Sequence, residues 1–163
     1  MEIELLERQS SELRKDIVEV CYHSKAGHVG GSLSAIDILN VLYFNELRID
    51  PNNPKMENRD RFILSKGHIA EALYVTLAKR GFFAYSELDN FSGYNTKYIG
   101  HPNNKVAGVE MNTGALGHGL AIGVGLAIAA KKMGQDYRTY VLMGDGELAE
   151  GSIWESAMAA GHY

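Results

Sequence analysis

A single aspartate stands between two glycines near the end of the chain, in the run Met143-Gly144-Asp145-Gly146. Glycines on both sides leave the Asp145 carboxylate unobstructed and let backbone N–H groups approach a phosphate. Magnesium takes hard oxygen ligands in proteins, commonly one or two carboxylates together with phosphate oxygens. Asp and Gly are also favoured in tight turns, so the tripeptide alone fits a simple turn as well. The pattern makes Asp145 a candidate magnesium ligand, with Gly144 and Gly146 beside a phosphate.

Histidine is the second residue type that could carry chemistry here. Five of the six histidines directly follow a glycine, namely His28, His68, His101, His118 and His162. Neutral imidazole both donates and accepts hydrogen bonds, and it changes charge near neutral pH. Several such groups on loop ends could converge on a hydroxyl-rich substrate, whereas any single one fits an isolated loop histidine. We assign His162 and His23 to the latter kind. Zinc is not favoured, because no histidine is paired with the one cysteine at ligand spacing.

The run from Asn112 to Gly119 contains three glycines and leads into an expected helix. Glycines before a helix N-terminus can bring backbone close to a ligand. The run also loosely mimics a dinucleotide fingerprint, but its spacing differs and no strand precedes it directly. Taken alone, it identifies no ligand.

Strands and helices are expected to alternate and so to position these segments. Periodicity predicts helices over residues 2–24, 36–44, 69–79, 116–133 and 152–160, and strands over 61–65 and 139–143. Ser34 is a candidate cap for the second helix, which is apolar nearly all round and should be buried. Residues 92–114 are expected to form loops.

This alternation predicts an α/β fold, with a parallel sheet flanked by helices on both faces. Ligands of such sheets bind at the carboxyl ends of the strands. Gly67-His68 and Gly144-Asp145-Gly146 both fall at such ends. We therefore expect them to share one site.

The composition limits the classes of protein to which this chain can belong. The 163 residues suffice for one domain, and the net charge of −4 is too mild to favour nucleic acid or a membrane surface as partner. A single cysteine excludes an internal disulfide and fits a reducing compartment. Met1 leads directly into acidic residues, and the longest apolar stretch, over 120–130, is too short to span a bilayer. We therefore expect a cytoplasmic protein.

Five segments occur together in the order and approximate spacing of the transketolase family. They are Ser24-Lys25-Ala26-Gly27-His28, Leu64-Ser65-Lys66-Gly67-His68, Gly100-His101-Pro102, Thr113-Gly114-Ala115-Leu116-Gly117, and Gly144-Asp145-Gly146 through Glu150-Gly151. The chain thus resembles the N-terminal, diphosphate-binding domain of a thiamine-diphosphate enzyme. It is most similar in layout to split transketolases, in which the pyrimidine-binding domain is a separate chain. The resemblance implies transfer of a two-carbon ketol unit from a ketose to an aldose, acting on sugars or sugar phosphates.

The resemblance also implies a role for each matched residue. Asp145 would ligate Mg2+, and His28 and His101 would face sugar hydroxyls, with His28 a candidate for proton transfer. Glu150 would be a carboxylate at the subunit interface, directed towards the partner's activating glutamate. The expected cofactor contacts come from His68, Gly114, Ala115, Leu116, Gly144, Gly146 and Glu150.

Two features depart from the family pattern. His118 stands where many members have glutamine, and Val29-Gly30-Gly31-Ser32 replaces the usual Pro-Gly-Ala-Pro. Both lie near the expected cofactor and sugar pocket, so an unusual sugar is a candidate substrate beside a pentose-phosphate intermediate.

The family's second magnesium ligand is an asparagine beyond one further helix and strand. Only 17 residues follow Gly146, and no asparagine follows Asn112. We therefore expect residues 1–163 to be a diphosphate-binding domain that lacks its C-terminal part. It would act in a homo- or hetero-oligomer with a chain carrying the pyrimidine-binding domain. Two alternatives remain open: another thiamine-diphosphate reaction, such as that of a synthase or decarboxylase, or a truncated, non-catalytic paralogue.

Overall fold

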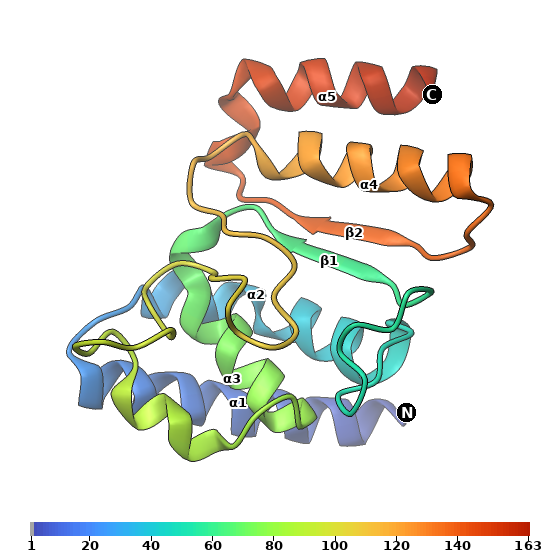
Figure 1. Ribbon diagram of the computed structural model, residues 1–163. Helices are drawn as coiled ribbons and strands as arrows, with labels where there is room; N and C mark the ends of the chain where they lie inside the picture. The colour runs from blue at the N-terminus through green and yellow to red at the C-terminus, as the bar shows by residue number, and fades with distance from the viewer. Residues whose placement is uncertain (1) are drawn as a thin grey trace.

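The computed structural model describes residues 2–163, which fold into a short parallel sheet with helices on both sides (Figure 1). The α-helices are α1 (Ile3–Ser24), α2 (Val29–Val41), α3 (Ala70–Arg80), α4 (Gly119–Met133) and α5 (Gly151–His162). The strands are β1 (Arg61–Leu64) and β2 (Thr139–Leu142). Short helical turns complete the described elements: the π-helical η1 (Leu42–Glu46) and the 3-10 turns η2 (Gly67–Ile69), η3 (Tyr85–Asn90) and η4 (Gly146–Ala149).

The two strands pair in parallel, with Arg61 opposite Thr139 and Leu64 opposite Leu142. In Figure 1, α1, α2 and α3 lie below the sheet, and α4 and α5 lie above it. The predicted α/β fold is therefore confirmed. Because both strands run the same way, the segments that follow Leu64 and Leu142 emerge side by side at one edge.

The main core lies between the lower helices and the sheet. The apolar stripe of α1 contributes Leu13 and Ile17, and α2 contributes Ile36 and Leu39, all fully buried. Every residue of α3 from Ala70 to Ala78 is buried, because this helix packs against both α1 and α2. Such a core fixes α3, and with it the segment 65–69 that joins β1 to α3.

Glycines bring α4 against the sheet. A Cβ added to Gly123 would lie 2.4 Å from Val141 Cγ2 of β2, and one added to Gly119 would lie 2.8 Å from Ser65 Cα. Neither approach is compatible with a larger residue, so α4 lies close to the sheet and to the end of β1.

None of the helices in residues 2–163 is long and apolar enough to cross a membrane.

The start of α2 differs from the prediction. The helix begins at Val29, with His28 as its N-cap, so Gly30 and Gly31 are helical. Ser34 is no cap; it lies inside the helix and donates to Gly31 O at 2.7 Å. The cap expectation was wrong because a distant carboxylate, described below, accepts the His28 N–H.

Burial of the second helix was also predicted too broadly. Ile38 is 48% exposed and Val41 is 40% exposed, so this helix buries only one face.

The start of α4 also differs from the prediction. The helix begins at Gly119 rather than at 116, because Gly117 has a φ of 85° that a helix does not allow. No helix or strand occurs over 92–114, as predicted.

Candidate functional site

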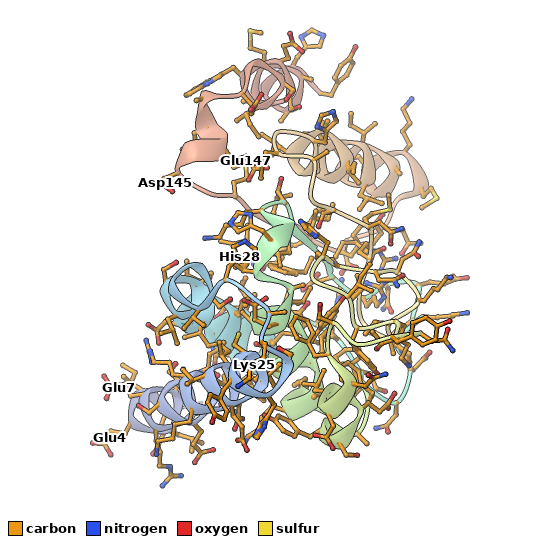
Figure 2. The ribbon with its side chains drawn as sticks, turned by 90° about the vertical axis from the view of Figure 1, so that its left-hand side faces the viewer. Glu4, Glu7, Lys25, His28, Asp145 and Glu147 are labelled. Atoms are coloured by element: carbon orange, nitrogen blue, oxygen red, sulfur yellow. The ribbon has the colours of Figure 1, made fainter. Side chains whose placement is uncertain are left out.

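The segments that follow the two strands meet at the carboxyl edge of the sheet. Figure 2 looks onto this edge and shows His28 on the lower layer, facing the turn that carries Asp145 and Glu147. Ser65 N donates to Leu142 O at 2.9 Å, which extends the pairing one residue beyond β1. The segments that follow β1 and β2 therefore lie side by side at this edge, as a parallel sheet predicts.

Glu147 is the buried centre of this edge, 2% exposed. Its Oε1 accepts a hydrogen bond from Ser65 Oγ and another from Gly117 N, the latter at 2.8 Å. Its Oε2 accepts from Gly144 N at 3.0 Å. One carboxylate thus ties the end of β1, the end of β2 and the loop before α4 together. A carboxylate satisfied by several donors is stable when buried, whereas an unpaired one is not.

The sequence did not single out Glu147. It sits in the 3-10 turn η4, and two of its three donors lie on segments far away in the chain. Local spacing carries no signal for such contacts. The one hint is its place three residues after Gly144, the reach of a side chain that returns to a backbone N–H.

Asp145 presents its carboxylate on the outside of the same turn. The residue is exposed, and no group in residues 2–163 hydrogen-bonds its side chain. A Cβ built on the neighbouring Gly146 would find no atom within 4 Å. An unpaired carboxylate beside open backbone suits a hard cation and an anionic ligand. The described residues contain no cluster of three or more His, Cys, Asp or Glu that would hold a metal alone. Any cation at Asp145 would therefore need further ligands, such as phosphate oxygens.

Two histidines from different elements lie together below this turn. The rings of His28 and His68 are 5.2 Å apart between centroids and meet edge to face at 66°. Burial lowers the pKa of His68 below its usual value, and the positive charge of His28, Lys66 and His101 lowers it further. A neutral His68 can both donate and accept a hydrogen bond. The pair can therefore contact hydroxyl groups and exchange protons with them.

His101 joins the site through the loop that precedes α4. A Cβ on Gly114, whose φ is 142°, would lie 2.5 Å from His101 Cδ2, so the ring packs directly against that backbone. The His101 carbonyl accepts a hydrogen bond from Tyr74 OH of α3 at 2.8 Å. The structure thus brings His28, His68 and His101 to one side of the molecule.

The loop 113–118 is pressed onto the end of β1. Thr113 Oγ1 donates to Leu64 O at 2.6 Å, and a Cβ on Gly67 would lie 2.8 Å from the Thr113 backbone. Ala115 and Leu116 follow with exposed side chains. The loop therefore offers backbone and a small apolar surface next to the histidines.

Four other residues considered in the sequence analysis have exposed positions in the structure. Glu150 is exposed in this chain and covers Gly117, where an added Cβ would lie 2.8 Å from Glu150 Cβ. His118 is exposed, with its Nδ1 3.1 Å from Leu116 O. His162 ends α5 and packs on Tyr163, and His23 lies on the exposed face of α1 beside Glu19, so the structure brings neither into the site.

The fold and this edge define an α/β protein with its ligand site at the carboxyl ends of parallel strands. The profile of the family "Transketolase, thiamine diphosphate binding domain" matches residues 7–163. The chain therefore belongs to the transketolase family and contains its thiamine-diphosphate-binding domain.

Relatives and solved structures agree with this assignment. The chain is 53% identical to one subunit of the apulose-4-phosphate transketolase of Phocaeicola vulgatus, over 100% of this chain and 58% of that protein. It is 42% identical to 6-deoxy-6-sulfo-D-fructose transketolase subunit SqwG of a Clostridium species, over 96% of this chain and 57% of that protein. The transketolase structure from Leishmania mexicana superimposes with a TM-score of 0.92 at 31% identity, covering 96% of this chain and 25% of that one. The chain thus spans little more than half the length of the two bacterial relatives.

Proposed function

We propose that this chain is the diphosphate-binding part of a split transketolase, which transfers a two-carbon ketol unit from a ketose to an aldose. The observation that carries the proposal is the convergence of three histidines from separate elements below the Asp145 turn. Proton exchange with sugar hydroxyls is work that such histidines can do, and a diphosphate bound through a divalent cation fits Asp145. Both bacterial relatives are named as single subunits of a transketolase, which supports a separate partner chain.

Asp145 would hold Mg2+, and the backbone of Gly146 would contact the diphosphate. Because Glu147 already accepts the Gly144 N–H, Gly144 would contribute close approach to the diphosphate and no hydrogen bond from its N–H. The fit rests on the exposed, unpartnered carboxylate and on the open space above Gly146. When bound, thiamine diphosphate supplies the carbanion chemistry of the transfer. The protein's own contribution is to bind and orient the reactants and to move protons.

We assign the remaining roles from the family resemblance, and the positions of these residues along the edge support them. Gly114, Ala115 and Leu116 would pack beside the cofactor rings. His68, held neutral, would lie near the diphosphate and the reacting carbon. His28 and His101 would bind the hydroxyls of the sugars, with His28 moving a proton.

Partner residues would complete the site. Glu150, exposed in this chain, would reach towards an activating glutamate of a second chain that carries the pyrimidine-binding domain. A second magnesium ligand and a sugar-phosphate site would come from chain outside residues 1–163. We place the complete enzyme in the cytoplasm, as a homo- or hetero-oligomer. Since the P. vulgatus relative acts on apulose 4-phosphate by name, that sugar phosphate is the first donor to test.

Calorimetry of the full-length protein in complex with its partner chain tests cofactor binding. Thiamine diphosphate with Mg2+ is expected to bind, and Asp145→Asn is expected to weaken binding at least about tenfold, because a neutral amide replaces the negatively charged carboxylate ligand. Asp89→Asn, on the exposed turn η3, is the matched control and should bind normally. Equal affinities for Asp145→Asn and the control would refute the role of Asp145.

A product assay tests which reaction the assembled enzyme catalyses. Ketose phosphates as donors and short aldoses as acceptors should yield products changed by two carbons. Consumption of pyruvate without reaction of any ketose would instead assign the chain to another thiamine-diphosphate enzyme. Absence of any turnover, with no cofactor binding, would favour a non-catalytic relative.

A further inference from the structure

Glu71 is a buried carboxylate directly beneath the histidine pair, and none of the roles above uses it. It lies in the first turn of α3 and is 0% exposed. Its Oε1 accepts a hydrogen bond from His28 N at 2.6 Å and one from Ser32 Oγ at 2.7 Å. Its Oε2 is buried and has no hydrogen-bond partner among the described residues. A carboxylate that is only half satisfied opposes folding, so stability alone does not account for it.

The contacts of Glu71 fix the backbone where α2 begins. His28 is the N-cap of α2, and Ser32 lies one turn into the helix. Negative charge is favourable at a helix N-terminus, and hydrogen bonds to an ionised acceptor are short and strong. Glu71 therefore holds the first turn of α2 from outside, through a main-chain and a side-chain donor.

Close packing constrains the backbone just before His28. A Cβ on Gly27, whose φ is 117°, would lie 2.6 Å from Cys21 Sγ and 3.1 Å from Glu71 Oε1. The chain before His28 is thus confined between α1 and the Glu71 carboxylate. This confinement fixes the backbone from which the His28 ring extends towards His68.

Glu71 also acts on His68 through its charge. Burial and the charges of His28, Lys66 and His101 lower the pKa of His68, and Glu71 alone among these groups raises it. Removing the charge of Glu71 would therefore lower the pKa of His68 further.

We propose that Glu71 is a positioning residue of the active site, which sets the place of His28 and the charge around His68. The expected effect of Glu71 on kinetics rests on the proposed sugar-transfer function. Its structural consequence, the placement of His28, is independent of the reaction.

Glu71→Gln tests the proposal in the full-length protein in complex with its partner chain. The amide oxygen can still accept from His28 N and Ser32 Oγ, but the charge is gone. The His28 amide proton resonance is expected to move upfield, and the His68 ring is expected to titrate at lower pH. The kcat/KM for the donor ketose should fall about tenfold or more, because a neutral acceptor holds His28 less firmly and small displacements of reacting groups are costly.

Asp60→Asn is the matched control. Asp60 is also buried, and it accepts from the backbone of Arg48 at 2.9 Å and of Arg138 at 2.7 Å, at the amino ends of the strands. Its neutralisation should lower stability without changing the His28 amide, the His68 titration or kcat/KM. Glu71→Gln behaving like Asp60→Asn in all three readouts would overturn the proposal.

Two further outcomes are decisive. If Glu71→Gln does not fold, Ser32→Ala, which removes one donor to Oε1, takes its place. A displaced His28 amide resonance with lowered kcat/KM would then support the proposal, and no change in either would overturn it. If the wild-type assembly transfers no ketol unit, the proposed function fails, and the amide and titration readouts alone uphold or overturn the placement of His28.

Discussion

The side chains of Ser65 and Glu147 are hydrogen-bonded to each other across 82 residues of sequence. Ser65 directly follows β1, and Glu147 lies one turn beyond β2. Ser65 Oγ also accepts from Gly119 N at 3.2 Å, where α4 begins. The pair therefore joins both strand ends to the helix that covers them. Residues that never face a substrate thus set the shape of the edge from which Asp145 projects.

Glu147→Gln should destabilise the fold by about 1–3 kcal/mol. The new amide NH2 group replaces an acceptor oxygen, so one backbone N–H loses its acceptor and faces another donor. Gly144 N, now bonded to Oε2, is the donor concerned. Guanidinium unfolding of the isolated chain measures the change. Glu155→Gln, exposed on α5, should stay within about 0.5 kcal/mol of wild type. Equal unfolding free energies for both variants would contradict this account of Glu147.

Gly114→Ala should displace His101 and lower kcat/KM of the assembled enzyme about ten- to a hundredfold. The new Cβ would lie 2.5 Å from His101 Cδ2, at a φ of 142° that strains any side chain. Gly100→Ala, next to His101 but facing open space, is the control and should keep near-normal kinetics. A Gly114→Ala enzyme with the activity of the Gly100→Ala enzyme would show that this contact does not matter.

Gly123→Ala and Gly125→Ala should change stability in opposite directions, although both lie in α4. At Gly123 the methyl would meet Val141 Cγ2 at 2.4 Å, and such overpacking costs about 1–3 kcal/mol. At Gly125 it meets nothing within 4 Å, so the higher helix propensity of Ala should add about 0.5–1 kcal/mol. Thermal unfolding reveals the sign in each case, and stabilisation by both would refute the close packing of α4 on β2.

Cys21 should react slowly with thiol reagents in the native protein. Burial and the charge of Glu71 raise the pKa of its thiol to about 11. A raised pKa keeps the thiol protonated at pH 8, where only about 0.1% would be the reactive thiolate. The rate with a chromogenic disulfide should climb with pH towards 11, and in guanidinium the thiol should react at once. Equal rates in native and unfolded protein would contradict the burial of Cys21.

Much of this architecture could be predicted from local patterns. The short apolar strands and the amphipathic first helix carry their own periodicity, so the parallel sheet and α1 were expected correctly. Gly67-His68 and Gly144-Asp145-Gly146 were correctly expected at the ends of the two strands, because parallel topology brings such ends to one edge. The assignment of roles to individual residues stays a prediction.

The remainder depends on contacts that no local window contains. Glu71 and Glu147 look like ordinary surface charges in the sequence, yet each is buried by partners from distant segments. The start of α2 at Val29 was missed for the same reason, since the acceptor of its cap N–H comes from α3. Helix 36–44 was expected to be buried all round because composition cannot tell which apolar face lacks a neighbour.

The long connection between the strands also governs when the site can exist during folding. Closing a large loop costs chain entropy before the contacts that reward it are made, so pairings between near neighbours such as α1 and α2 can form first. The link from Ser65 to Glu147 can form only once the ends of β1 and β2 lie side by side. We therefore expect the edge that carries Asp145 to assemble late in folding. A ligand bound there would stabilise the folded chain by an amount that grows with the logarithm of the ligand concentration divided by its Kd, since it binds only the folded state.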